Sequence, residues 1–352
     1  MNDRKALKFI RGILIASGAV LLLCAVFTFV TDPFYQYHGP WFSEGAYLDR
    51  AVYQTAGAAR NLEYEDVILG SSMTENFRVS EFNDLFGWNT VKLSYSGCWT
   101  DDLKAVLGQI YKTHTVDHMV LSVDMYQYME EDSAVRVCTE RPSYLYTTSI
   151  LDDAPYLWNM DVLGEGAGLI LKALSGNGPD ADDSYTWDHP TGLDVVLASY
   201  LDEREQALQA DHEMLPSDAF IESTQAAMNN IEPFIREHPE TEFYLFFPAY
   251  SMLYWDQMNV HGETDAVIGA TKYLVSTYLA YDNVRIWYFP QAPVTEDLSR
   301  YLDTGHHDAG VSHDEMVWMH DGIYELTPDN YEEVLDAMLL KARTYDYSIY
   351  FQ

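Results

Sequence analysis

The N-terminal segment limits what this chain can fold into more than any other feature of the sequence. Four basic residues precede an uncharged apolar run over residues 12–30: Arg4, Lys5, Lys8 and Arg11. The 19 residues of the run would rise about 28 Å as an α-helix, close to the thickness of the hydrocarbon core of a bilayer. The sequence therefore predicts a single N-terminal transmembrane helix.

Charge on either side of the apolar run predicts the orientation of the chain. Basic residues precede the run and Asp32 follows it, which favours a cytoplasmic N-terminus and an extracytoplasmic remainder. The alternative is a cleaved signal peptide, but its apolar stretch is usually shorter and ends in a small-x-small site. Residues 28–34 read Thr-Phe-Val-Thr-Asp-Pro-Phe instead. We expect a basic stub and anchor over residues 1–31 and a juxtamembrane linker over residues 32–60.

Net charge excludes one class of partner. The chain has 55 acidic and 20 basic side chains and a formal charge of −35, which repels phosphate backbones and argues against nucleic acid. The 27 Tyr and 8 Trp residues fit either a polysaccharide-binding surface or an aromatic core. Outside the anchor, Cys98 and Cys138 are expected either to form a disulfide or to stay as free thiols.

Beyond residue 60, short apolar runs alternate with amphipathic segments. Five runs have the length and polar boundaries of buried strands: residues 66–69, 90–94, 118–123, 243–247 and 284–289. Strands that alternate with helices predict an α/β fold with a parallel sheet covered on both faces. We expect one extracytoplasmic domain over residues 61–345, with an insertion or lid at about 141–215, where the pattern weakens.

A pair of serines follows the first predicted strand. In parallel α/β sheets, ligands bind outside the carboxyl ends of the strands. Ser71 and Ser72 come directly after Gly70, so they lie where a nucleophile is expected, and the glycine permits a tight turn. Serine is also a favoured helix N-cap, and this motif alone fits that interpretation as well.

A second polar cluster, residues 301–308, lies late in the chain. A serine nucleophile needs a base to take its proton, and the base needs an acceptor that orients it. Asp303 and His306 are three residues apart and can project to the same side of a turn. The sequence therefore predicts a triad of Ser72, Asp303 and His306. A metal site among the acids and histidines of this region, or an exposed polar loop, is the alternative, although the spacings match no common zinc scaffold.

Three motifs together resemble the SGNH (GDSL-like) hydrolase superfamily: Gly70-Ser71-Ser72, Gly97 after the second predicted strand, and Asp303-Thr-Gly-His306. The resemblance implies a three-layer, flavodoxin-like α/β fold with about five parallel strands. It implies Ser72 as the nucleophile, His306 as the base and Asp303 as its orienter. The amides of Ser72 and Gly97 would form the oxyanion hole, with no cofactor and no metal ion.

One position departs from the pattern of that superfamily. Where the family has an Asn that donates a hydrogen bond to the oxyanion, this chain has Asp124, and an ionised carboxylate cannot donate. Ser71 replaces the Asp that usually precedes the nucleophile. We expect both residues in the substrate or oxyanion region. Either the amides of Ser72 and Gly97 suffice, or Asp124 has another role.

A narrower resemblance is to membrane-anchored cell-envelope members of the superfamily, such as the D-alanyl transfer protein of teichoic-acid modification and alginate acetylation proteins. It rests on the Gly-Ser-Ser motif, the anchor, and residues 247–255 and 321–330. It implies O-acyl ester hydrolysis or acyl transfer on a cell-envelope polysaccharide, beside a membrane-bound O-acyltransferase. The alternatives are a non-catalytic glycan-binding or scaffold protein of the same fold, and a metal-dependent hydrolase.

Overall fold

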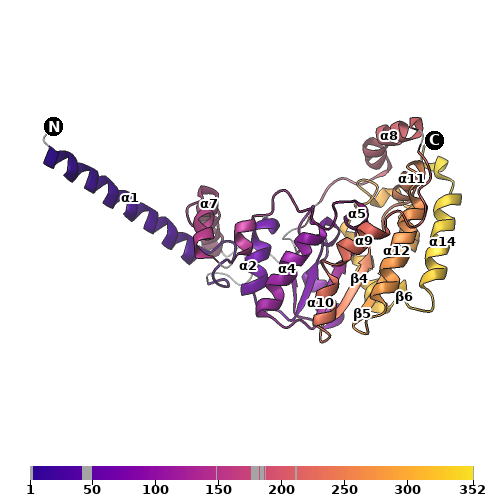
Figure 1. The fold of residues 1–352 in the computed structure, drawn as a ribbon, viewed down its shortest axis with the longest axis horizontal. Coiled ribbons are helices and arrows are strands. Elements are labelled where there is room, and N and C mark those ends of the chain that lie inside the picture. Colours follow the sequence, from indigo (N-terminus) through magenta and orange to yellow (C-terminus); the bar gives the residue numbers. More distant parts are fainter. Residues whose placement is uncertain are drawn as a thin grey trace. The chain divides into compact units, whose positions relative to one another are not determined.

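The computed structural model describes residues 3–41, 50–147, 149–175, 182, 186, 188–210 and 212–351 (Figure 1). The chain divides into two compact units. Residues 1–63 and 142–184 form the first, here called the N-terminal unit. Residues 64–141 and 185–352 form the second, here called the sheet unit.

The N-terminal unit is built from helices: α1 (Asp3–Thr31), α2 (Ala51–Asn61), η2 (Ser143–Tyr146), η3 (Ile150–Asp153), α6 (Ala154–Leu157) and α7 (Met160–Ser175). Its segment Arg4–Thr31 is long and apolar enough to cross a membrane. Helix α1 packs against α6 and α7. Gly166 of α7 meets Phe27 and Thr31 of α1, and a side chain at that glycine would collide with them.

A buried carboxylate holds the chain reversal that follows α1. Asp32 accepts the backbone N–H groups of residues 36–38 at 2.7–3.0 Å and the hydroxyl of Tyr156 at 2.6 Å. Burial raises the pKa of Asp32, and the bonds from Tyr156, Tyr37 and His38 oppose that shift. The range 32–60, which we expect to be a linker, thus contributes a buried turn and α2 to a folded unit.

The sheet unit contains one sheet of six strands: β1 (Asp66–Leu69), β2 (Thr90–Lys92), β3 (His118–Ser122), β4 (Glu242–Phe247), β5 (Val284–Tyr288) and β6 (Glu325–Leu326). The strand order is β2-β1-β3-β4-β5-β6. The first five strands are parallel, and β6 pairs antiparallel with β5. The prediction of an α/β fold with a mostly parallel sheet is confirmed. Two-residue β6 is too short to give a sequence signal.

Helices flank the sheet: α3 (Val79–Phe86), α4 (Thr100–Thr113), α5 (Tyr126–Met129), α8 (Leu193–Gln209), α9 (Ile221–Met228), α10 (Glu232–Glu237), α11 (Met252–Val260), α12 (Thr264–Tyr278), α13 (Ala309–Asp321) and α14 (Tyr331–Thr344). Alternate strand residues such as Ile68, Val120 and Trp287 join a buried cluster with α3 and α13. Figure 1 shows α4, α9 and α12 in front of the strands. Because β1 is buried along its whole length, both faces of the sheet are covered.

The region expected to be an insertion or lid is divided between the two units. Residues 142–184 belong to the N-terminal unit, whereas α8 belongs to the sheet unit. Helix α8 packs against α11, where Asp256 accepts hydrogen bonds from Tyr200 at 3.0 Å and from Arg204 at 2.5 Å. Because Asp256 is 3% exposed, this ion pair fixes α8 firmly to α11.

Candidate active site

The predicted nucleophile lies just beyond the carboxyl end of β1. Strand β1 ends at Leu69, and a single 3-10 turn, η1 (Ser72–Thr74), follows Gly70 and Ser71. A Cβ atom at Gly70 would collide with the side chains of Ser122 and Thr74, so the chain can turn this closely only with glycine there. The fold therefore presents Ser72 at the edge of the sheet where ligands bind in α/β proteins.

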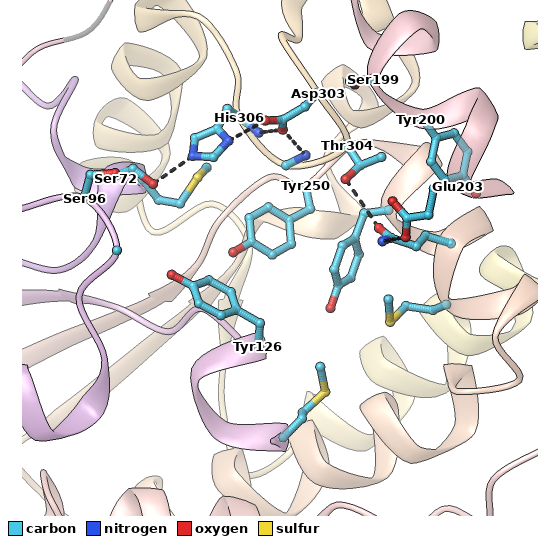
Figure 2. Close-up of a pocket in the computed structure, with 17 residues that line it drawn as sticks. Ser72, Ser96, Tyr126, Ser199, Tyr200, Glu203, Tyr250, Asp303, Thr304 and His306 are labelled. Carbon is cyan, nitrogen blue, oxygen red and sulfur yellow. Dashed lines mark hydrogen bonds and ion pairs between the residues drawn. The ribbon is translucent and has the colours of Figure 1, made fainter. Parts of the chain in front are cut away.

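Ser72, His306 and Asp303 come together in one hydrogen-bonded chain (Figure 2). The Ser72 Oγ lies 2.8 Å from Nε2 of His306, and His306 Nδ1 lies 2.7 Å from Oδ2 of Asp303. A carboxylate can only accept, so Nδ1 carries the proton and Nε2 is left to accept from the serine hydroxyl. The structure thus brings together all three residues predicted as a triad.

The loop that carries the acid and the base is pre-formed. Oδ1 of Asp303 accepts the amides of Gly305 at 2.8 Å and His306 at 2.7 Å. One carboxylate oxygen therefore shapes the turn, while the other orients the imidazole. This division fixes the His306 ring before any substrate is bound.

Electrostatics favour a strong base at His306. Burial alone would lower the pKa of His306, but the hydrogen bond and charge of Asp303, helped by the charges of Asp124 and Glu75, outweigh it and raise the pKa. For Asp303, burial works against ionisation, yet its bonds to His306 and to the turn amides lower the pKa below the usual range. Asp303 therefore stays ionised and is placed to stabilise an imidazolium at His306.

The other acids and histidines of this loop face elsewhere. Asp308 pairs with Arg300 through two bonds of 2.6 and 2.7 Å. His307 is buried, with Nε2 3.5 Å from Glu315, and His313 contacts Glu81 at 2.9 Å. In the described part of the chain, no three His, Cys, Asp or Glu side chains come together as metal ligands would. The donors that suggested a metal site are thus spread over separate partners.

Gly97 lies where an oxyanion-hole residue is expected. It lines the same pocket as Ser72 and His306, directly before the chain enters α4. Its φ of +69° belongs to the left-handed region, which glycine adopts without strain. A Cβ atom built there meets nothing within 4 Å. The positive φ, and not crowding, is therefore what favours glycine at position 97, and the residue presents main chain to the pocket.

Asp124 and Ser71 lie beneath the pocket and do not line it. Asp124 is fully buried, with Oδ2 accepting the hydroxyls of Ser71 at 2.7 Å and Ser122 at 3.0 Å. Its Oδ1 accepts the hydroxyl of Tyr250 at 2.6 Å. Burial raises the pKa of Asp124, and the three hydroxyls oppose that shift. A buried carboxylate needs such donors, so these residues form a supporting network instead of contacting substrate.

The pocket beside Ser72 has a volume of about 570 Å³ and a mostly apolar wall. Tyr and Met side chains from α5, α8 and α11 supply much of it: Tyr126, Met129, Tyr200, Tyr254 and Met258. Polar groups at the far side include Glu203 and Gln257, which are hydrogen-bonded to each other at 2.5 Å. None of the lysines and arginines in the described ranges lines this pocket. Sequence patterns did not identify this wall, because its residues meet only through tertiary packing.

The two cysteines outside α1 are free thiols, as is Cys24. Cys98 is buried beside the Gly97 turn, and burial, followed by the charge of Asp102, raises the pKa of its thiol. A buried thiol of raised pKa is a poor nucleophile. Cys98 therefore does not compete with Ser72 for a catalytic role.

No model of a known protein family matches the chain, and no curated protein matches it either. The resemblance to SGNH hydrolases thus rests on the sequence motifs alone. What bears on function is the geometry of the residues in those motifs.

Proposed function

We propose that the protein is a serine-dependent O-acyl ester hydrolase or acyltransferase of SGNH type, acting on a cell-envelope polysaccharide. The observation that carries this proposal is the continuous hydrogen-bonded chain from Ser72 through His306 to Asp303. Triads of this geometry recur on unrelated folds and perform acyl transfer. The strand order, with the serine after β1, is also consistent with a flavodoxin-like fold.

The geometry supports a two-step reaction. Ser72 Oγ attacks the acyl carbon, His306 Nε2 takes the serine proton, and the carbonyl π electrons move to oxygen. When the tetrahedral intermediate collapses, the C–O bond to the alcohol breaks and His306 returns the proton to the departing oxygen. Water or a sugar hydroxyl then attacks the acyl-serine with the same base, which gives hydrolysis or transfer respectively.

The pocket wall supports an uncharged acyl ester as substrate. Among the residues that the structure describes, His306 is the only basic side chain in the pocket lining, so none of the described lysines or arginines pairs there with a phosphate or carboxylate. Tyrosine rings suit sugar rings and acyl chains, because they combine apolar faces with a polar tip. A neutral glycan ester also agrees with a chain of net charge −35, since an acidic surface repels anionic polymers.

Helix α1 supports a place for the enzyme at the membrane. Its length and composition suit a membrane span, and the basic residues before it favour a cytoplasmic N-terminus. The sheet unit would then act outside the cytoplasm, where envelope polysaccharides are modified. A membrane-bound O-acyltransferase that supplies the acyl group is the partner that this arrangement suits.

A fluorophosphonate probe tests the proposal on the full chain in detergent. The native protein should be labelled, and Ser72→Ala and His306→Ala should both lose labelling. Ser276→Ala, an exposed serine on α12, is the matched control and should label as the native protein does. A folded native protein that does not react would contradict the proposal and favour a glycan-binding scaffold. Hydrolysis that survives Ser72→Ala but stops with a chelator would contradict the serine mechanism.

A further inference from the structure

A tetrahedral intermediate at Ser72 requires hydrogen-bond donors around its oxyanion, and such donors are usually the largest single contribution to catalysis of this kind. Asp124 cannot be one of them, because it is fully buried and both of its oxygens accept hydroxyl groups. We propose that the hydroxyl of Tyr126 donates a hydrogen bond to this oxyanion, alongside the amides of Ser72 and Gly97. The inference rests on the proposed function and names one more catalytic residue of the same site.

Tyr126 occupies the right place in the fold. It begins α5, just past the carboxyl end of β3, and β3 lies next to β1 in the sheet. It lines the same pocket as Ser72, Gly97 and His306. Figure 2 shows the ring of Tyr126 pointing its hydroxyl into the pocket, toward the side where Ser72 lies.

Two contacts fix Tyr126 against the turn that contains Gly97. The Nε2 amide of Gln127 donates to the carbonyl of Cys98 at 2.6 Å and to the phenol oxygen of Tyr126 at 3.4 Å. The ring of Tyr126 also packs edge-on against Trp99, with 5.4 Å between ring centroids. Gln127 therefore links the Tyr126 hydroxyl to Cys98, the residue after Gly97, and the Tyr126 ring packs against Trp99.

The Tyr126 side chain also lies near the turn that carries Ser72. Ser71, which precedes Ser72, is among the groups that influence the pKa of Tyr126, and Tyr126 and Ser72 line the same pocket. Tyr126 thus contacts the segment of Gly97 and faces the segment of Ser72, whose amides flank the expected oxyanion. Because Gln127 donates to the phenol oxygen, the phenol proton remains for donation to an acceptor in the pocket.

The protonation state of Tyr126 suits a donor. Burial, followed by the charge of Asp124, raises the pKa of Tyr126 far above its ordinary range. The phenol therefore stays neutral at every pH at which His306 can act as a base. In the reaction the carbonyl π electrons move to oxygen as the Ser72–carbon bond forms, and the Tyr126 O–H stabilises that charge without transferring its proton.

The test compares Tyr126→Phe with the native full-length chain in detergent, using p-nitrophenyl acetate as substrate. Phenylalanine keeps the ring that packs on Trp99 and removes only the hydroxyl. Loss of one oxyanion donor should lower kcat by about a hundredfold and leave KM within about twofold, because the bond forms only in the transition state. Ser72 would attack the carbonyl carbon of a trifluoromethyl ketone to give an oxyanion. This inhibitor should therefore bind more weakly to the variant by a similar factor.

Two further variants separate this role from a structural one. Tyr278→Phe removes a buried hydroxyl on α12 that has no hydrogen-bond partner within the described part of the chain, and its kinetics should match those of the native protein. Asp124→Asn added to Tyr126→Phe should not restore kcat, because position 124 faces the buried network. If the native protein hydrolyses the ester and Tyr126→Phe does so equally fast, the role of Tyr126 is overturned while the proposed function stands. Restoration of kcat by adding Asp124→Asn would have the same consequence. A native protein without esterase activity or fluorophosphonate labelling would overturn the proposed function itself.

Discussion

The loops after β3 and β5 each place an aspartate near Ser72, and the two aspartates have different partners. Asp303 keeps a side chain that is 36% exposed and gives one oxygen to its own turn and the other to His306. Asp124 is fully buried, and both of its oxygens accept hydroxyl groups from separate parts of the sheet unit. Proximity to Ser72 therefore does not define the role of an acid. The role follows from the exposure of the carboxylate and from the partners of its two oxygens.

The largest effect should come from Asp303. Asp303→Asn keeps the side-chain shape but lets an amide N–H face Nδ1 of His306, which selects the wrong tautomer. We expect kcat for ester hydrolysis to fall about 10⁴-fold, while the free energy of unfolding changes by less than about 1 kcal/mol. Steady-state kinetics and urea unfolding of the same preparation measure both. If Asp303→Asn lost stability but kept kcat, Asp303 would have the structural role that we assign to Asp124.

The pH dependence of ester hydrolysis by the native protein should follow His306. The base must be neutral to take the serine proton, so kcat/KM should fall tenfold per unit as the pH drops below the pKa of His306. Because Asp303 raises that pKa above the ordinary value of about 6.5 for histidine, the midpoint should lie above the ordinary value. Removing the charge in Asp303→Asn should move the residual midpoint toward lower pH. An unchanged midpoint would show that Asp303 does not act on His306.

Asp124 should matter mainly for stability. Asp124→Ala leaves the hydroxyls of Ser71, Ser122 and Tyr250 without their acceptor in a buried site. At about 1 kcal/mol or more for each unsatisfied group, we expect the free energy of unfolding to fall by about 3 kcal/mol. Equilibrium unfolding monitored by tryptophan fluorescence gives this value. Asp282→Ala, on an exposed turn before β5, serves as a control and should change it by less than about 0.5 kcal/mol.

The smallest effect should come from one bond of the same network. Tyr250→Phe removes the 2.6 Å bond to Asp124 and leaves that carboxylate its two serine hydroxyls. We expect a loss of about 1.5 kcal/mol in the free energy of unfolding, at the lower end for a hydrogen bond to a charged group because two donors remain. A double-mutant cycle with Asp124→Ala checks that the two losses are coupled. Simple additivity would mean that Tyr250 is not held by Asp124.

The sequence predicted the parts of this site that depend on short stretches of chain. Strand β1 with Gly70 and Ser72, and the turn from Asp303 to His306, are local patterns, and strand-end placement in a parallel sheet brings them to one edge. His306 and His307 are adjacent, however, and only the packing shows that one faces Ser72 and the other Glu315.

Features that depend on long-range contacts were not predicted. The N-terminal unit unites residues 1–63 with 142–184, so residues 32–60 look like a linker when they are considered alone. Helix α8 reaches the pocket through the bonds of Tyr200 and Arg204 to Asp256, and sequence spacing cannot reveal these partners. Asp124 looked like a lost oxyanion donor because two of its three hydroxyl partners, Ser71 and Tyr250, come from distant segments.

Covalent capture of an acyl group is the sharpest test of Ser72 as the nucleophile. The full-length protein would be mixed with p-nitrophenyl acetate, quenched in acid within the first turnover, and digested for peptide mass spectrometry. We expect one acetyl group on the peptide that contains Ser72, localised to that residue by fragmentation, and none in Ser72→Ala. Turnover of the ester with no adduct on Ser72, or with the acetyl group on another residue, would contradict this role of Ser72.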